Sequence, residues 1–516
     1  MPETIDRIVI GYGSESGNAR GLVQRLLHLP FLQPFELAVQ DLNALMLDTL
    51  TPKDRLIIVS SSFGDGDPPA NAECFIERIA NTPTLRNLSY AIFGLGDTAY
   101  PTFCGFTKAV DAALLAGNAV PFMNRVDADS DFEAFFETWC TAFHAVLQGN
   151  PRAGTTLRLQ VKAYGEHAAY PARVIARTQL NQSPPFAFHL RLDIEGSGIK
   201  YRAGDNLYVL APNEPDLLSH LVQWFDNTDV EALLENRELR QVSKSTLREI
   251  ARTTQNEDLK GLLKVSQRKA LEEYLYGKDI LDILTDFCDP HSFTPQDLAQ
   301  WLPQLLPRAY SIASHDNTTY VDVCFREINY SLSGRQRKGA ATGFLTSQNP
   351  TVKIFARSNP RFHLPKGVDH PLVLIGTGTG IAPLIALLEQ LGQENHTPQT
   401  CLVFGDRRRA SDFLYKPKID LWKEKGILNK VLTAFSRDGE SRYYVQDAIV
   451  EHGAYIWGLL EAGAHLYLCG NKSNLERSIN QALATIAIIF GHLTEEAAGL
   501  FVEDLEADNR LHKELY

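Results

Sequence analysis

Cysteine is scarce in this sequence, and its few copies form no paired motif. The 516 residues hold seven cysteines, without a CxxC pair among them. Such a dispersed set fits reduced thiols and argues against a disulfide framework or a cysteine-ligated iron–sulfur cluster. HExxH spacing is also absent, so we expect no resident metal ion. The cysteines are Cys74, Cys104, Cys140, Cys288, Cys324, Cys401 and Cys469.

Long hydrophobic runs are missing as well. The longest nearly uncharged run, HPLVLIGTGTGIAPLIALL, is interrupted by three glycines and by Pro383, so it predicts a strand, a turn and a helix rather than a membrane span. The start, MPETIDRIVIGYG, has no basic region followed by an apolar one, and we expect no export signal. Both observations favour a cytoplasmic protein.

Positive charge is low in the first part of the chain. The net charge is −12, and residues 1–147 alone hold 18 acidic and 9 basic residues, a balance of −9. Nucleic acid is therefore an unfavourable partner for this region. An acidic surface of this kind steers a basic protein partner, or it is a solvated face that keeps a domain soluble.

The pattern of strands and helices predicts an α/β protein of several domains. Residues 1–147 alternate strands and helices, which indicates a doubly wound parallel sheet with its ligand at the carboxyl ends of the strands. A linker follows over 148–167. Short alternating strands over 168–365, interrupted by a helical insertion at about 214–305, predict an antiparallel β-barrel. Strand–helix alternation returns over 366–516 and predicts a second doubly wound domain.

The stretch VIGYGSESGNARGLVQRLL runs a strand into a loop of small residues and then into a helix. Ser14, Ser16 and Asn18 can present hydroxyl and N–H groups at the helix N-terminus, while Gly17 allows close approach of the backbone. Such a loop binds phosphate without a lysine. The alternative is an ordinary N-capping turn.

Two further loops follow the next strands at the same expected edge. They read FGDGDPPANAECF and GLGDTAYPTFCGF, and each carries glycines and one aromatic residue, Phe63 or Tyr100. Two aromatic faces at one edge can sandwich a flat ring. Taken alone, either aromatic residue is more typical of packing.

The middle region contains PRAYSIAS, which offers Arg308 for a pyrophosphate, Tyr310 to stack on a ring, and Ser311 as a hydrogen-bond donor. KGAATGFL follows with Thr342 at an expected helix start, a second phosphate site.

The last region, residues 366–516, carries the motifs that indicate a nicotinamide dinucleotide site. Three glycines lie between strand and helix in VLIGTGTGIAPLIALL, where the backbone can approach a pyrophosphate. FSRDGESRYYVQ brings Ser436, Arg437 and Arg442 together, a set suited to the 2′-phosphate of NADPH. Arg407 is a second candidate for the pyrophosphate.

These segments occur in an order that resembles the NADPH-dependent diflavin reductases, and the resemblance covers essentially the whole chain. SESGNAR, GLGDTAYPTFC, PRAYSIAS and the terminal tyrosine are most similar to the bacterial sulfite reductase flavoproteins. The resemblance implies a flavodoxin-like FMN domain, an FAD domain of the ferredoxin–NADP reductase type, and an NADPH domain. Electrons would pass from NADPH to FAD, then to FMN, and then to a metalloprotein that docks on the acidic FMN domain.

The resemblance also implies the residues of each site. The catalytic set is Ser311, Cys469 and Glu514, with Tyr516 covering the flavin ring. The FMN residues are Ser14, Glu15, Ser16, Gly17, Asn18, Ala19, Ser61, Ser62, Phe63, Gly64, Leu95, Gly96, Asp97, Tyr100, Phe103 and Cys104. The FAD residues are Arg308, Ala309, Tyr310, Ser311, Cys324, Phe325, Arg326, Gly339, Ala340, Ala341 and Thr342. The NADPH residues are Gly378, Thr379, Arg407, Ser436, Arg437, Arg442, Tyr443, Tyr444, Val445 and Gln446.

Three positions depart from the family pattern. Glu514 stands where aspartate is usual, Asn471 stands where aspartate is common, and Thr377 replaces a usual proline. Several functions stay open at this point. The acceptor is the haemoprotein of an assimilatory sulfite reductase or, alternatively, a haem protein or metalloenzyme of the kind served by cytochrome P450 reductase. A scaffold that lost its cofactors, or a simple NADPH oxidase or quinone reductase, are the other candidates.

Overall fold

The chain folds into two compact units, which are interleaved along the sequence. The first holds Met1–Gly165 and Pro212–Leu306, and the second holds Glu166–Ala211 and Pro307–Tyr516. The computed structural model describes residues 5–15, 17–62, 66–82, 84–86, 88–98, 102–129, 132–159, 169–365, 367, 369–394 and 398–516.

The first unit begins with a parallel sheet of order β2-β1-β3-β4-β5, in which β6 also pairs with β4. Strand β1, between β2 and β3, is buried on both faces, which explains its apolar run IVI. This order confirms the expected flavodoxin-like, doubly wound arrangement. The strands are β1 (Arg7–Gly13), β2 (Glu36–Asp41), β3 (Asp54–Ser61), β4 (Ser89–Leu95), β5 (Val120–Pro121) and β6 (Val126–Ala128).

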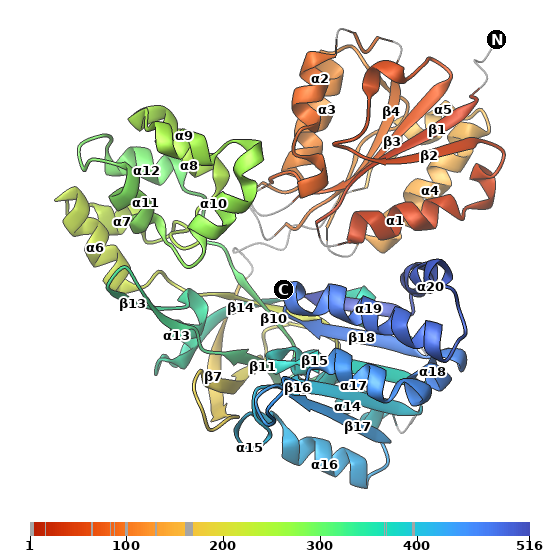
Figure 1. Ribbon diagram of the computed structural model, residues 1–516. Coiled ribbons are helices and arrows are strands. Elements are labelled where there is room, and N and C mark those ends of the chain that lie inside the picture. The colour runs from red at the N-terminus through yellow and green to blue at the C-terminus, as the bar shows by residue number, and fades with distance from the viewer. Residues whose placement is uncertain are drawn as a thin grey trace. The chain divides into compact units, whose positions relative to one another are not determined.

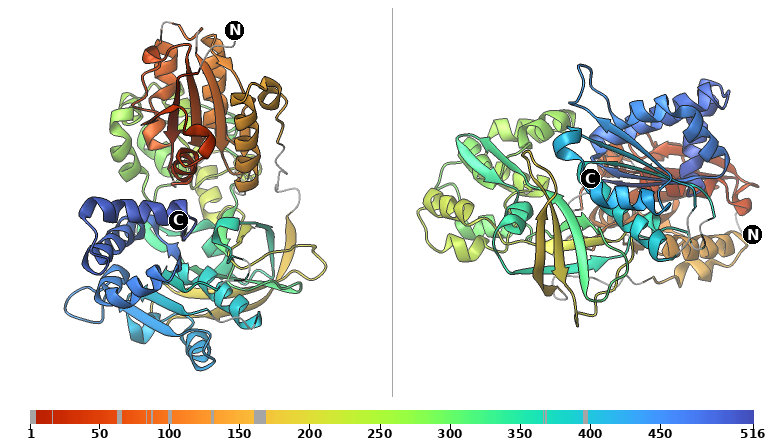
Figure 2. Two further views of the ribbon diagram at one scale, coloured as in Figure 1. Left: turned by 90° about the vertical axis from the view of Figure 1, so that its right-hand side faces the viewer. Right: turned by 90° about the horizontal axis from the view of Figure 1, so that it is seen from below.

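Helices cover both faces of this sheet, as Figures 1 and 2 show. Apolar residues of α1 and α4 pack on one face, where Trp139 is fully buried. Residues of α2 and α3 pack on the other face. The helices are α1 (Asn18–Leu27), α2 (Phe75–Asn81), α3 (Gly105–Ala116), α4 (Glu133–Leu147) and α5 (Pro151–Thr155).

The rest of the first unit is the expected helical insertion, which has a hydrophobic core of its own. Side-chain caps define where its helices begin: Ser243 caps α8, Asn256 caps α9, and capping boxes start α11 and α12. The helices are α6 (Pro215–Phe225), α7 (Val230–Leu234), α8 (Lys244–Thr254), α9 (Glu257–Leu262), α10 (Arg268–Leu275), α11 (Ile280–Phe287) and α12 (Pro295–Trp301).

The second unit contains an antiparallel sheet of order β10-β9-β14-β7-β8-β11. An isolated bridge joins Ile312, just after β10, to Val323 of β11, but among the described residues no ladder pairs the two end strands, so the sheet is not closed into the expected barrel. The strands are β7 (Tyr170–Gln179), β8 (Ala187–Asp193), β9 (Asn206–Leu210), β10 (Arg308–Ser311), β11 (Tyr320–Arg326) and β14 (Thr351–Arg357), and a hairpin of β12 (Asn329–Leu332) and β13 (Arg335–Lys338) leads to α13 (Ala340–Thr346).

A second parallel sheet completes this unit, in the order β17-β16-β15-β18-β19. Helices α14 and α16 pack on one face, and α17 to α20 pack on the other. Its strands are β15 (Leu372–Thr377), β16 (Thr400–Asp406), β17 (Lys430–Phe435), β18 (His465–Gly470) and β19 (Leu511–Leu515). Its helices are α14 (Ile381–Gln393), α15 (Arg409–Asp412), α16 (Lys416–Glu424), α17 (Val445–Glu451), α18 (Gly453–Glu461), α19 (Lys472–Ile489) and α20 (Glu495–Ala507).

The described part of the chain shows neither a membrane-spanning helix nor a metal-binding cluster. No helix there is long and apolar enough to cross a membrane. No group of three or more His, Cys, Asp or Glu residues there is arranged to hold a metal ion.

Candidate functional site: three nucleotide sites

The first loop has the geometry of a phosphate cradle. Gly17 precedes α1 with a φ of 87°, in the left-handed region that favours glycine, and a Cβ placed there would meet nothing within 4 Å. A left-handed residue followed by helical ones aims successive N–H groups into one concavity. The open backbone at the N-terminus of α1 therefore fits an anionic phosphate.

Asn71, which the sequence analysis missed, holds this loop in place. Its Oδ1 accepts a hydrogen bond from the Ser14 N–H at 2.9 Å, and its Nδ2 donates to Asp41 Oδ1 at 2.7 Å. The adjacent Ala70 N–H donates to Glu15 Oε2 at 3.0 Å. The only sequence signal was a polar residue in PPANAE, on a loop at the ligand edge of the sheet.

Replacing Asn71 by alanine should weaken binding of the expected FMN about tenfold, because the hydrogen bond that positions the Ser14 N–H, worth about 1 kcal/mol, would be lost. Titration of FMN into the flavin-depleted full chain, followed by quenching of flavin fluorescence, measures the dissociation constant. Asn43→Ala is the matched control, because the Asn43 amide anchors the same loop through Ala70 O and the Cys74 N–H without contacting Ser14. An equal loss in both variants would contradict a specific role for Asn71.

The other two FMN loops are anchored at the same sheet edge. Ser62 Oγ accepts from the Phe106 N–H at 3.2 Å, and the Gly96 N–H donates to Ala128 O at 2.9 Å. Gly96 lies so close to Cys104 that a Cβ would come within 2.8 Å of its Sγ. Ser16, Phe63, Gly64 and Tyr100 lie outside the described residues, so the aromatic sandwich remains a prediction.

On the FAD side, β10 pairs with β9 and places Ser311 opposite Asn206. Tyr310 packs edge-on against Phe325 with ring centroids 6.1 Å apart, and burial raises the pKa of its hydroxyl. Gly339 precedes α13, where a Cβ would come within 2.5 Å of Thr342 Oγ1. A larger residue at this helix start would therefore have to displace the Thr342 side chain.

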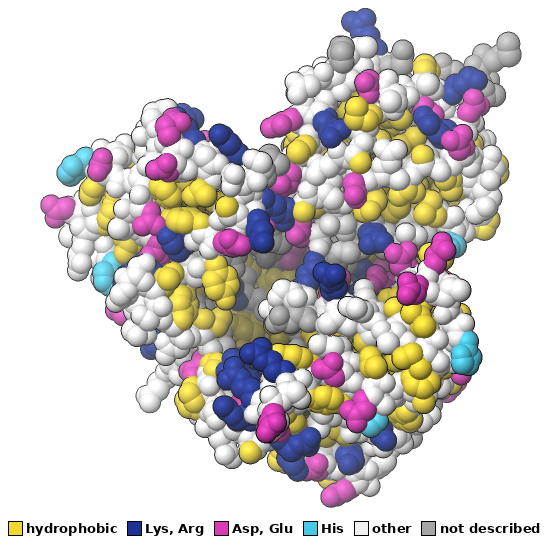
Figure 3. All heavy atoms as spheres, in the orientation of Figure 1, with side chains coloured by type: hydrophobic (Ala, Val, Ile, Leu, Met, Phe, Trp, Pro, Cys, Tyr) yellow, Lys and Arg dark blue, Asp and Glu magenta, His cyan; other side chains and the backbone are white. Residues whose placement is uncertain are grey.

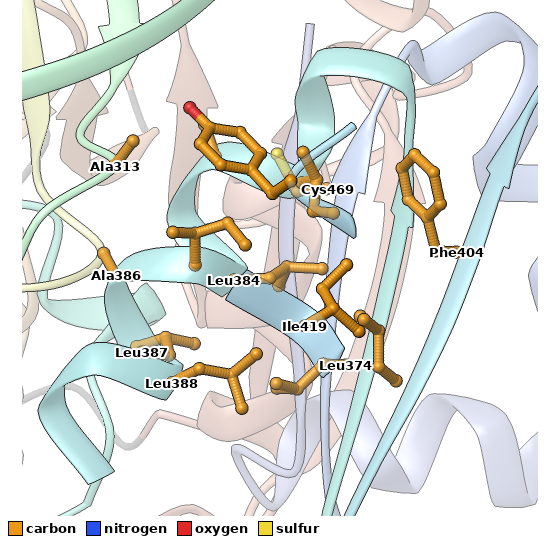
Figure 4. Close-up of a cluster of buried hydrophobic side chains, with 14 of the residues drawn as sticks. Ala313, Leu374, Leu384, Ala386, Leu387, Leu388, Phe404, Ile419 and Cys469 are labelled. Atoms are coloured by element: carbon orange, nitrogen blue, oxygen red, sulfur yellow. The ribbon is translucent and has the colours of Figure 1, made fainter. Parts of the chain in front are cut away.

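The structure brings the expected catalytic residues together. Ser311 Oγ donates to Glu514 Oε1 at 2.6 Å across 203 positions of sequence. Strands β18 and β19 pair in parallel with Cys469 opposite Glu514. Cys469 is fully buried in the apolar cluster that also contains Leu384 and Phe404 (Figure 4).

Burial sets the charge of this group of residues. It raises the pKa of Glu514 to about 7, although the hydrogen bond from Ser311 opposes the shift and nearby Asp205 adds to it. Burial, then the neighbouring Glu514, raise the pKa of the Cys469 thiol, so Cys469 stays protonated. Among the described residues, Glu514 Oε2 is shielded from solvent and accepts no hydrogen bond. Glu514 can therefore hold or release a proton near neutrality.

Tyr516 is tied to the nearby glycine-rich turn. Its hydroxyl lies 3.1 Å from Thr379 Oγ1, its N–H donates to Gly470 O at 3.1 Å, and its carbonyl accepts from the Lys472 N–H at 2.9 Å. The residue is still 59% exposed. A ring held by few bonds at an exposed position can be displaced by a ligand.

The expected NADPH segments meet at one edge of the second parallel sheet. The turn Gly378–Gly380 lies between β15 and α14, and a Cβ on Gly380 would come within 2.3 Å of Cys469 O. The Ser436 N–H donates to Asp406 O, and the Arg437 N–H donates to Arg407 O at 2.8 Å. Basic side chains gather on this unit close to α15 (Figure 3). This edge has the cations and open backbone that a dinucleotide phosphate requires.

The segment from Arg442 to Gln446 forms the entry to α17. Tyr444 precedes the helix, and Val445 and Gln446 form its first turn. Arg442 Nη1 donates to Tyr444 Oη at 3.3 Å, and Tyr443 Oη donates to Glu451. In this structure the Arg442 guanidinium thus contacts its own segment.

Two polar residues beside Ser311 were also missed from the sequence. Asp205 accepts hydrogen bonds from the Asn359 N–H at 2.8 Å and from the Arg202 N–H at 2.8 Å, and it lies 2.6 Å from His363 Nε2. Asn206 lies close enough to Glu514 to oppose the rise of its pKa. The sequence feature that could have indicated these residues is the adjacent acid and amide in YRAGDNLYVL, where β9 begins.

Comparisons with known proteins agree with this arrangement. Three family models match in sequence: flavodoxin over 10–139, an FAD binding domain over 164–254, and an oxidoreductase NAD-binding domain over 374–481. The "Sulfite reductase [NADPH] flavoprotein alpha-component" of Mannheimia succiniciproducens is 31% identical over 98% of this chain and 89% of the relative. The proteins of that description from Bacillus subtilis and Neisseria meningitidis serogroup C are 28% and 29% identical, covering 90% and 88% of their own lengths.

The chain belongs to the sulfite reductase flavoprotein family. Membership confirms the predicted diflavin architecture and the predicted class of enzyme, an NADPH-dependent flavoprotein oxidoreductase. The three matched domains confirm FMN, FAD and NADPH as its cofactors. The roles of single residues in this flavoprotein remain predictions, and so do the domain boundaries at 147, 167 and 365.

Proposed function

We propose that this flavoprotein passes electrons from NADPH to the haemoprotein of an assimilatory sulfite reductase in the cytoplasm. The observation that carries the proposal is the match along nearly the whole chain to relatives named as sulfite reductase flavoprotein components. When bound, NADPH supplies a hydride and the two flavins pass its electrons on singly, which suits a haem acceptor.

The residues of the chain take complementary roles in this proposal. The loop around Gly17 binds the FMN phosphate, and Arg308 with the start of α13 binds the phosphates of FAD. Arg407, Ser436 and Arg437 bind the phosphates of NADPH. Ser311 donates a hydrogen bond at the flavin, while Glu514 supplies or withholds negative charge beside it.

Docking of the acceptor would use the acidic FMN domain. Two of its carboxylates are already engaged inside the first unit: Glu73 pairs with Lys244 at 2.9 Å, and both Glu15 and Glu73 pair with Arg268. Glu77 lies in the first turn of α2, just after the loop at the ligand edge, and is exposed. We therefore assign docking to Glu77.

The variant Glu77→Gln should lower the rate of electron transfer to a sulfite reductase haemoprotein about threefold at low ionic strength, and the difference should shrink as salt screens the charges. The rate is measured from NADPH oxidation coupled to sulfite reduction. Glu36→Gln is the matched control, because Glu36 is exposed at the amino end of β2, on the opposite edge. Equal salt dependence in all proteins would refute the docking surface.

Transfer to a P450-like haem protein but not to the sulfite reductase haemoprotein would favour the alternative acceptor.

A further inference from the structure

Arg326 at the end of β11 makes contacts that the sequence did not suggest. Its Nη2 donates to Asp406 Oδ2 at 2.6 Å, and its Nη1 donates to Pro185 O at 3.4 Å and lies 4.0 Å from Asp412 Oδ1. The side chains of Arg326 and Asp406 are only 17% and 6% exposed. The resemblance assigned Arg326 to FAD, whereas its guanidinium pairs with a carboxylate at the end of β16, in the nucleotide sheet.

Asp406 lies among the three segments expected to bind the phosphates of NADPH. A Cβ placed on Gly378 would lie 4.0 Å from Asp406 Oδ2. Asp406 Oδ1 accepts from the Arg407 N–H at 2.8 Å, and its carbonyl accepts from the Ser436 N–H at 3.0 Å. A negative charge is therefore built into a site whose ligand is itself negative.

An unpaired carboxylate at this place would repel a phosphate strongly, because burial weakens solvent screening. Burial raises the pKa of Asp406, and Arg326 is the charge that most opposes this shift. Burial also lowers the pKa of Arg407, as do the nearby guanidinium groups of Arg326 and Arg437. Arg326 and Arg407 thus flank Asp406 beside the glycine-rich turn, and a second buried carboxylate, Asp412, lies near Arg326 and adds to the rise in the pKa of Asp406.

We propose that Arg326 is a positioning residue for nucleotide binding: by pairing with Asp406 it cancels the negative charge beside Gly378, so that the pyrophosphate of the dinucleotide can bind there. The inference rests on NADPH binding at this turn. It concerns the pyrophosphate, which NADPH and NADH share, rather than the 2′-phosphate. Removing Arg326 should therefore weaken both nucleotides equally, and removing the charge of Asp406 as well should restore them.

The test compares Arg326→Gln, Asp406→Asn and the double variant in the full-length holoenzyme. Dissociation constants for NADP⁺ and NAD⁺ are measured by titration calorimetry, and the FAD content of each protein is determined. We expect Arg326→Gln to weaken both nucleotides about tenfold, with FAD content unchanged. The double variant should bind both within about threefold of the original protein. Arg326→Lys, which keeps the positive charge, should bind more tightly than Arg326→Gln.

Arg191→Gln is the matched control. Arg191 pairs with Asp322 through two hydrogen bonds of 2.7 Å in the same sheet, and Asp322 is fully buried. This change breaks a comparable ion pair away from the glycine-rich turn, so nucleotide affinity should stay unchanged even if thermal stability falls.

Three outcomes would overturn the proposal. Loss of FAD from Arg326→Gln with unchanged nucleotide affinity would place Arg326 at the flavin. A double variant that binds as weakly as Arg326→Gln would show that Asp406 is not the cause. Equal weakening in Arg191→Gln would show a general effect of lost stability. Because no electron acceptor takes part, these results are independent of the acceptor proposed above.

Discussion

Replacing Glu514 by glutamine should slow anaerobic flavin reduction by NADPH about 100-fold above pH 7, and much less below it. Burial raises the pKa of Glu514 to about 7, so the group is neutral at lower pH and ionised at higher pH. The ionised carboxylate stabilises the positive charge that develops as hydride leaves the nicotinamide ring, and an amide cannot do so. In the original protein the rate should therefore rise through pH 7. In the variant this rise should disappear.

Stopped-flow absorbance measures this rate, and two variants serve as controls. Glu514→Asp keeps the charge and should keep a rise with pH. Glu496→Gln removes an exposed carboxylate from α20 and should change nothing. If Glu514→Gln lowered the rate equally at every pH, Glu514 would act by orienting Ser311 through their 2.6 Å hydrogen bond, and its charge would be irrelevant.

Replacing Tyr516 by alanine should raise kcat/KM for NADH at least about tenfold. The terminal ring is held by a hydrogen bond to Thr379, and we expect this bond to be broken before a nicotinamide ring reaches the flavin. NADPH gains binding energy at its 2′-phosphate, whereas NADH lacks that group. Displacing the ring costs about 1–2 kcal/mol in lost hydrogen bonding and packing. Removing the ring therefore raises kcat/KM most for NADH, which has no 2′-phosphate contact to offset this cost.

Steady-state kinetics with both nucleotides measures this change. Thr379→Val removes only the hydroxyl partner, so it should act in the same direction with a smaller gain of about fivefold. If kcat/KM for NADH were unchanged in Tyr516→Ala, the ring would not obstruct the nicotinamide, and nucleotide selection would depend on the phosphate-binding residues alone.

The fold class and the phosphate sites were predictable from sequence because their signals are local, and the resemblance to the diflavin reductases then implied which cofactors occupy them. A parallel sheet requires an apolar strand, a small-residue loop and a helix in succession, and a phosphate requires an open backbone at the start of that helix. The segments around Gly17 and Gly378 each show such a pattern within about ten residues, whereas Gly339 follows the polar strand RQRK and shows only the small-residue helix start. The structure places all three at the starts of helical turns.

The short strand β19 could not be predicted from a local pattern. Its five residues, LHKEL, show little alternation of apolar and polar side chains, and no strand was predicted there. Pairing with β18 makes them a strand and sets Glu514 opposite Cys469. Strand pairing over this distance depends on the completed sheet rather than on local preference.

Sequence by itself determined the order of the domains and the residue types at each phosphate site, since these depend on local conformation and on matched chemical groups. Only the tertiary structure decided how charges are paired inside the sites. Asn71 reaches Ser14 over 57 positions, Ser311 reaches Glu514 over 203, and Arg326 reaches Asp406 over 80. The physical reason is that burial and proximity set the charge of Glu514 and the partner of Asp406, and both arise only when distant segments pack together.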